Sequence, residues 1–187
     1  MTTDTRQTIL QAAQTVVQAR GYNALSFREL AKDVGIKSAS IHYHFPTKGD
    51  LGAALARRYT EGAVVLFEQF LTASREPSSM LKEYTAVFRA ALENGNRMCL
   101  CGILAAEHHD LPPEVQVEVK AFTDANIAWL TKVLALEQAD AQPEALRQQA
   151  FSIFAAIQGA QLVSRGRNDI AIYDQLIGSY RLAGLIP

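Results

Sequence analysis

Apolar residues recur at intervals of three and four along most of this chain, and no segment alternates between apolar and polar residues for long. Intervals of three and four mark one face of an α-helix, whereas strict alternation marks a strand. The pattern therefore predicts an all-α protein with about nine helices. Judged from their apolar faces, caps and stops, the predicted helices cover residues 5–20, 26–34, 37–45, 48–74, 77–94, 97–109, 113–137, 143–165 and 170–185.

Two short helices around a tight turn form the most informative part of this pattern. Ser26 and Glu29 have the spacing of a capping box, which starts a helix, and Gly35 suits the left-handed turn that ends one. The second helix, over residues 37–45, ends before Pro46, and nearly all its side chains can bond a phosphate or a base edge. Because a helix this short and polar does not stabilise itself, we expect its exposed face to contact a partner.

This stretch resembles the helix-turn-helix of the TetR family of transcriptional regulators. The matching residues are Phe27-Arg28-Glu29-Leu30-Ala31, Val34-Gly35-Ile36-Lys37, Ile41-His42-Tyr43-His44-Phe45 and Lys48, after a long helix that ends in Arg20-Gly21-Tyr22. The resemblance implies an N-terminal three-helix helix-turn-helix DNA-binding domain over residues 1–47. It also implies a C-terminal helical domain over residues 48–187 for effector binding and dimerisation. The family commonly has Tyr where this chain has His42, so the phosphate contact of that Tyr falls to His42 or to Tyr43.

The expected DNA contacts come from the turn and the two helices around it. We expect base or close groove contacts from four residues, Arg28, Ser38, Ser40 and Tyr43. We expect mainly phosphate contacts from five others, Ser26, Lys37, His42, His44 and Lys48. A single short recognition helix gains specificity when a dimer doubles it, so the expected partner is double-stranded DNA with a near-palindromic operator.

The last two predicted helices each carry an apolar face. The two faces contain Phe151, Phe154, Ile157, Gly159, Ala160 and Val163, and then Ile172, Leu176, Ile177, Tyr180 and Ala183. One interpretation is that these faces pack inside the protomer. The other is a homodimer in which each subunit contributes its last two helices to a four-helix interface, as TetR-like proteins do. The resemblance favours the homodimer.

Aromatic residues and a few amides gather in the middle helices, where the resemblance places the effector site. Such residues are more often plain core than pocket. The candidate pocket residues are Tyr59, Phe67, Phe88, Leu104, Phe122, Asn126, Trp129, Phe154 and Gln158. Their mixture of aromatic rings and amides indicates an uncharged or weakly polar organic effector, whose release of the protein from DNA would make it a repressor.

A second cluster contains the only two cysteines, Cys99 and Cys101, followed by His108 and His109. A metal site needs more ligands at good spacing, so we predict neither a metal nor a cofactor. One alternative is a TetR-like sensor of electrophiles, oxidants or metal, because some TetR-like regulators respond through cysteine. A weaker alternative is a helical Cys/His enzyme. Against it, the sequence contains no nucleophile elbow and no glycine-rich phosphate loop, so we predict no enzymatic activity.

The distribution of charge indicates which end of the chain contacts phosphates, and the composition indicates where in the cell the protein is expected. The chain has 187 residues and a net charge of −1, yet its basic residues are concentrated at one end. Through Arg58 there are eight Lys and Arg against four Asp and Glu, and the remainder has ten against fifteen. A basic module followed by an acidic body is expected when only one end meets phosphates. With no recognisable signal peptide, no membrane-length apolar run and two closely spaced cysteines, we expect a cytoplasmic protein.

Overall fold

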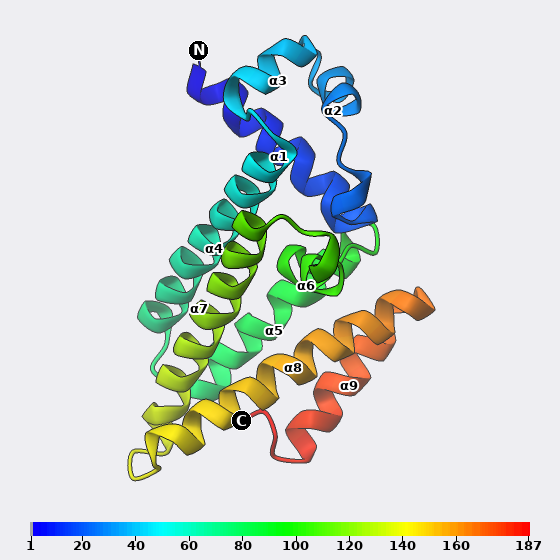
Figure 1. Ribbon diagram of the computed structural model, residues 1–187. Helices are drawn as coiled ribbons and strands as arrows, with labels where there is room; N and C mark the ends of the chain where they lie inside the picture. Colours follow the sequence, from blue (N-terminus) through cyan, green and yellow to red (C-terminus); the bar gives the residue numbers. More distant parts are fainter. Residues whose placement is uncertain (1) are drawn as a thin grey trace. The chain divides into compact units, whose positions relative to one another are not determined.

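The computed structural model describes the backbone of residues 2–187 and the side chains from residue 5 onward. The described residues form α-helices and short 3₁₀ helices with no strand, which confirms the predicted all-α class. The helices are α1 (Thr2–Arg20), η1 (Tyr22–Ala24), α2 (Phe27–Val34), α3 (Ser38–His44), α4 (Lys48–Ala73), α5 (Pro77–Glu93), α6 (Leu100–Ala106), η2 (His108–Asp110), α7 (Pro113–Glu137), α8 (Pro143–Arg167) and α9 (Ile170–Leu182) (Figure 1).

The chain folds into two compact units. The first unit contains the chain up to Glu61 together with Leu100–Phe122, and the second contains Gly62–Cys99 together with Thr123–Pro187. The long helices α4 and α7 each contribute residues to both units. This division follows packing, whereas the boundary at residues 47 and 48 divides the chain by expected function, and that boundary stays a prediction. No helix in the described part of the chain is both long and apolar enough to span a membrane.

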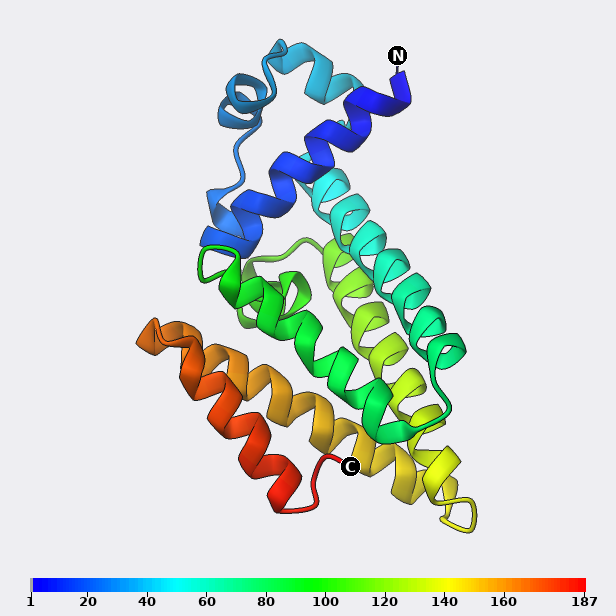
Figure 2. The ribbon, with the colours of Figure 1, turned by 180° about the vertical axis from the view of Figure 1, so that it is seen from behind.

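In the first unit, α1, α2 and α3 pack together at the N-terminal end (Figures 1 and 2). The Ser26 hydroxyl accepts a hydrogen bond from the Glu29 backbone N–H at 3.5 Å, as the capping box predicted. Gly35 ends α2 with φ +74°, a left-handed conformation that favours glycine. Thr47 and Asp50 then cap the start of α4 reciprocally, the backbone N–H of each bonding the side chain of the other at 3.0 Å. These local signals fix where the helix-turn-helix begins and ends.

The predicted helix over residues 97–109 is wrong at both ends, since α6 covers only Leu100–Ala106 and a 3₁₀ turn follows. At the start, Gly95 and Asn96 have positive φ angles of 74° and 55°, which turn the chain out of helical geometry. The Cys99 backbone N–H then donates to the Gln161 side-chain Oε1 at 2.9 Å. Cys99 therefore lies before the helix, and Cys101, His108 and His109 do not share a helix face.

In the second unit, α8 packs along α9, and both helices contact α5 (Figure 2). The Tyr173 hydroxyl of α9 donates to the Thr85 carbonyl of α5 at 2.8 Å. The Gln161 amide of α8 donates to the Phe88 carbonyl at 2.8 Å. These polar contacts at the buried junctions fix how α8 and α9 are rotated about their axes.

The face predicted for dimerisation is partly wrong because of this rotation. Ala160 is fully buried within the protomer, and Ile157 and Ile177 are also buried. The apolar side chains that α8 leaves exposed are Phe151, Leu162 and Val163. The predicted face of α8 therefore combined buried residues, Ile157 and Ala160, with exposed ones, Phe151 and Val163.

Candidate nucleic-acid interface

Helix α3 buries one side chain and exposes the opposite side. Ile41 is fully buried and packs the helix against the rest of the first unit. On the opposite side Tyr43 is 78 % exposed and Ala39, one turn before it, is also exposed, as are His42 and the N-cap residue Lys37. A short helix with an apolar anchor beneath and hydrogen-bonding groups above has the form of a recognition helix. Ala39 was missed by sequence reasoning, which considered only polar and aromatic side chains, although an alanine methyl can contact the methyl group of thymine.

The end of α3 is held by an edge-on aromatic pair and a cation–π contact. Phe45 is buried, and the Arg6 guanidinium of α1 lies 5.1 Å from the centre of its ring. The His42 ring packs edge-on against the Phe27 ring with their centres 4.7 Å apart, and His42 Nδ1 lies 3.4 Å from the Pro46 carbonyl oxygen. His42 is thus exposed but fixed in orientation, whereas Tyr43 projects outward. The contact that the family assigns to Tyr is accessible to both residues.

The other predicted DNA-contacting residues differ in exposure. Arg28 on α2 is exposed over 83 % of its side chain. Ser38, Ser40 and His44 are half-buried along the two edges of α3. Ser26 is also half-buried, and its hydroxyl oxygen already accepts the capping hydrogen bond. Its hydroxyl hydrogen can still donate to a phosphate.

Among the predicted DNA-contacting residues, Lys48 has a side chain that is held by contacts with neighbouring residues. It is half-buried, and its Nζ lies 4.5 Å from the centre of the Tyr22 ring and donates to the Asn23 carbonyl at 3.4 Å. Burial lowers the pKa of its ammonium group, while the nearby Glu107 carboxylate acts in the opposite direction. The residues from Arg28 to Lys48 therefore include one widely exposed cation, Arg28, and one held by neighbouring groups, Lys48.

The predicted pocket residues do not form one set in either unit. Leu104, Tyr59 and Phe122 belong to the first unit, where the last two rings lie 5.4 Å apart. The other six belong to the second unit: Phe67, Phe88, Asn126, Trp129, Phe154 and Gln158. We therefore describe each group within its own unit.

The aromatic residues of the second unit are mostly satisfied core. Trp129 stacks on Phe67 at 4.9 Å, and its indole N–H donates to the Phe67 carbonyl at 3.1 Å. The Tyr84 hydroxyl donates to Asn126 Oδ1 at 2.7 Å. Burial raises the pKa of Tyr84 well above its usual range, so the hydroxyl stays protonated and remains a donor. Asn126 thus has a structural role in addition to its predicted place in a pocket.

Gln158 differs from these residues. Its side-chain Oε1 and Nε2 are both buried, and neither has a hydrogen-bond partner among the described residues. One turn later, Gln161 uses both ends of its amide, toward the Cys99 N–H and the Phe88 carbonyl. A buried amide without partners costs about 1–3 kcal/mol, so Gln158 is an unsatisfied polar group among the buried atoms of the second unit.

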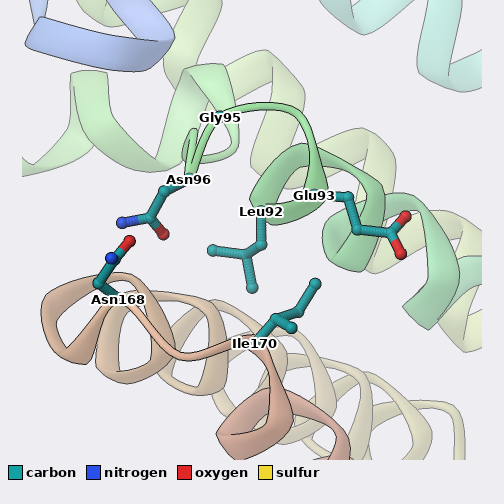
Figure 3. Close-up of a pocket in the computed structure, with 6 residues that line it drawn as sticks. All are labelled: Leu92, Glu93, Gly95, Asn96, Asn168 and Ile170. Carbon is teal, nitrogen blue, oxygen red and sulfur yellow. The ribbon is translucent and has the colours of Figure 1, made fainter.

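A pocket of about 550 Å³ opens elsewhere in the second unit, and no predicted pocket residue lines it. Figure 3 shows the Asn96 and Asn168 carboxamides pointing toward one another, with Leu92 and Ile170 at the apolar side. Asn96 Nδ2 donates to the Arg165 carbonyl at 3.1 Å, which joins the turn after α5 to the end of α8. Asn96 thus ties its turn to the end of α8.

The two cysteines are buried. Cys99 and Cys101 are 1 % and 3 % exposed. Thiol reactivity requires access and a stabilised thiolate, and burial opposes both. Within the described residues, no group of three or more His, Cys, Asp and Glu side chains is placed to hold a metal ion.

Known proteins resemble this chain over both its N-terminal part and its whole length. Residues 9–55 match the family model described as bacterial regulatory proteins, tetR family. The crystal structure of a TetR transcriptional regulator from Legionella pneumophila is 30 % identical, covers 94 % of this chain and 95 % of that chain, and superposes with a TM-score of 0.87. A TetR-family regulator from Agrobacterium tumefaciens is 29 % identical with the same coverage and TM-score.

One relative of this chain is named as a transcriptional repressor. It is the HTH-type transcriptional repressor KstR2 of Mycolicibacterium smegmatis, 30 % identical over 88 residues. That match covers 47 % of this chain and spans 42 % of the length of the relative.

Proposed function

This chain belongs to the TetR family of transcriptional regulators, and we propose that it is a dimeric DNA-binding repressor that a small organic effector releases from its operator. The observation that carries the proposal is the orientation of α3. Its one apolar anchor, Ile41, is buried, and the opposite side presents Tyr43 and the residues around it. The flanking helix adds the exposed cation of Arg28. This surface is built for phosphates and base edges.

Repression is favoured by the relative that bears the name of a repressor, whose match covers 47 % of this chain. The family's regulators, moreover, are not enzymes. The buried positions of Cys99 and Cys101 give no support to the thiol-sensor alternative. An organic effector is therefore the favoured signal.

The proposed dimer uses the exposed sides of α8 and α9. Leu162 is 58 % exposed and Leu182 is 92 % exposed, with Phe151 and Val163 beside them on α8. Phe151 and Leu162 are eleven residues apart, or about three helical turns, and so lie on one side of α8, and exposed apolar side chains on one side of a helix mark a contact site. A two-fold dimer through this face would present two recognition helices to successive major grooves about 34–36 Å apart.

The proposed effector site includes Gln158. Its unpartnered amide offers one donor side and one acceptor side, which match an organic molecule that carries an amide or a carboxylic acid. The effector would act by favouring one spacing of the recognition helices while DNA favours another.

The test begins by selecting a duplex from a randomised library with the wild-type protein. Mobility-shift titrations with that duplex should show cooperative, salt-dependent binding, and sedimentation should give two protomers per duplex. Small amides and carboxylic acids are then screened for release of the duplex, and Gln158→Leu should lose the response while keeping DNA affinity. Failure to select any duplex would reject the DNA-binding function itself.

A further inference from the structure

The turn between α1 and α2 receives its cap from a residue far along the chain. Gly21 ends α1 with φ +86° and supplies no side-chain cap to η1. The Tyr22 backbone N–H instead donates to Glu107 Oε2 at 2.5 Å. A Cβ added at Gly21 would overlap the Glu107 carboxylate, so the carboxylate lies directly against this backbone. Glu107 therefore fixes the position of the Tyr22–Asn23 turn.

A second carboxylate of the same segment reinforces this contact. Asn23 Nδ2 donates to Asp110 Oδ2 at 2.8 Å, so η1 is held at two successive residues. The 3₁₀ helix η2, which contains Asp110, is in turn bonded to α7, because Gln116 Nε2 donates to the His108 carbonyl at 3.2 Å. The turn is thus attached to α6, η2 and α7 within the first unit.

The anchored turn holds Lys48 in place. The Lys48 ammonium group lies over the Tyr22 ring at 4.5 Å and donates to the Asn23 carbonyl at 3.4 Å. An ammonium group has three N–H donors, so a donor remains for another acceptor. A lysine that is already ordered loses less conformational entropy on binding a phosphate than a free surface lysine does.

We propose that Glu107 is a positioning residue for DNA binding, which holds the Tyr22–Asn23 turn so that Lys48 presents its ammonium group to a DNA phosphate. The inference rests on the proposed DNA-binding function and goes beyond it by assigning a role to a residue outside the helix-turn-helix. Glu107 follows directly after α6, so two hydrogen bonds connect the end of α6 to Lys48 through the Tyr22–Asn23 turn.

The test compares the wild type with four variants and a matched control on the duplex selected by the wild type. Glu107→Ala should lower affinity about tenfold and reduce the salt slope by about one, because one fixed phosphate contact is lost. Glu107→Gln keeps a side-chain oxygen that accepts from the Tyr22 N–H, so the slope should be retained. Lys48→Ala should reduce the slope by the same amount, and the double variant Glu107→Ala/Lys48→Ala should show no further reduction.

The matched control is Glu118→Gln, which removes the same charge in the same unit from a carboxylate that pairs with Arg57. It should leave the salt slope unchanged. If Glu107→Ala unfolds, Asp110→Ala provides a milder variant that loses only the Asn23 contact, and it should lower affinity and slope in the same direction. Circular dichroism establishes that each variant is folded.

Two results would overturn the inference. One is a loss of affinity in Glu107→Ala with an unchanged salt slope, which would reduce Glu107 to a purely structural residue. The other is an effect of Glu107→Ala that persists undiminished in the Lys48→Ala background. If the wild type itself binds no duplex, the proposed function fails and this inference fails with it. If the wild type binds and Glu107→Ala matches Glu118→Gln, only this inference fails.

Discussion

Helices α3 and α8 each bury one apolar side completely, but their exposed sides differ in chemistry. Ile41 of α3 and Ile157 of α8 are both fully buried. The exposed side of α3 presents Tyr43 among hydrogen-bonding groups, whereas the exposed side of α8 presents Leu162 and Val163. Apolar surface in water costs about 25 cal/mol per Å², so only the α8 surface gains from being covered by another apolar surface. One protomer therefore carries two surfaces that suit two kinds of partner.

The difference predicts two separable kinds of failure. Damage to the α8 surface should remove DNA binding indirectly, by separating protomers that contribute one recognition helix each. Damage to the α3 surface should leave the dimer intact and change DNA binding alone. Variants at the two surfaces therefore distinguish assembly from recognition.

The largest expected effect is that of Leu162→Arg on α8. Leu162 is 58 % exposed in the protomer, so an arginine there fits the folded chain. In a dimer it would bury an unpaired charge at a cost of about 3 kcal/mol or more, which is a loss of more than 100-fold in association. Sedimentation at low micromolar concentration should show monomers, and affinity for the selected duplex should fall with them.

The matched control for this change is Val117→Arg on α7, which makes a similar substitution at an exposed apolar position in the first unit. It should remain dimeric and bind the duplex as the wild type does. A Leu162→Arg protein that stays dimeric would show that the interface lies elsewhere.

The contrast between Leu162 and Ala160 also shows where sequence reasoning stops. Periodicity correctly placed the beginning of α8 at Pro143 and showed that the helix is amphipathic. It could not decide which of two neighbouring apolar stripes turns inward, because that depends on long-range contacts. The Gln161 amide bonds the Phe88 carbonyl of α5, and this contact turns Ala160 into the core.

The second prediction separates recognition from phosphate binding on α3. Tyr43→Ala should cost about 1–3 kcal/mol on the selected duplex and relax the preference for that sequence, with the salt slope unchanged. Lys37→Ala should weaken all duplexes similarly and lower the slope by about one, because Lys37 is exposed at the start of α3 and is expected to contact phosphate. The measurement is affinity for the selected duplex and a scrambled duplex at several salt concentrations.

Both variants should sediment as dimers, in contrast to Leu162→Arg. An altered salt slope in Tyr43→Ala with unchanged sequence preference would assign Tyr43 to phosphate contact instead. That result would move the base-reading role toward Ala39, which is exposed beside Tyr43 on the same side of α3.

The helix-turn-helix was predictable because its signals are local. Each helix is started or ended by a residue next to it: α2 begins after Ser26 and ends at Gly35, and α3 ends shortly before Pro46. The position of the Lys48 ammonium group was not predictable. Lys48 bonds the Tyr22–Asn23 turn, and that turn is held by a hydrogen bond from the Tyr22 backbone to Glu107, 85 residues further along the chain. No pattern of apolar spacing encodes such a contact.

The smallest expected effect concerns the attachment of α9 to α5, which keeps the exposed sides of α8 and α9 in one surface. Arg89 Nε donates to Asp174 Oδ1 at 2.7 Å, and this hydrogen bond lowers the pKa of Asp174 below its ordinary value of 3.8. Because the folded pKa is lowered, the pair stabilises the fold above the titration range of the unfolded carboxyl. That stabilisation is lost as pH falls through the folded pKa. The Asp174 side chain is 50 % exposed, so solvent screening limits the contribution to about 0.2–1 kcal/mol.

Asp174→Asn should lower the free energy of unfolding by this amount at pH 7 and by less near about pH 3, as measured by urea denaturation. Asp140→Asn, at an exposed position between α7 and α8, is the control and should show no such difference. An equal loss at both pH values would mean that packing of the side chain, rather than its charge, attaches α9.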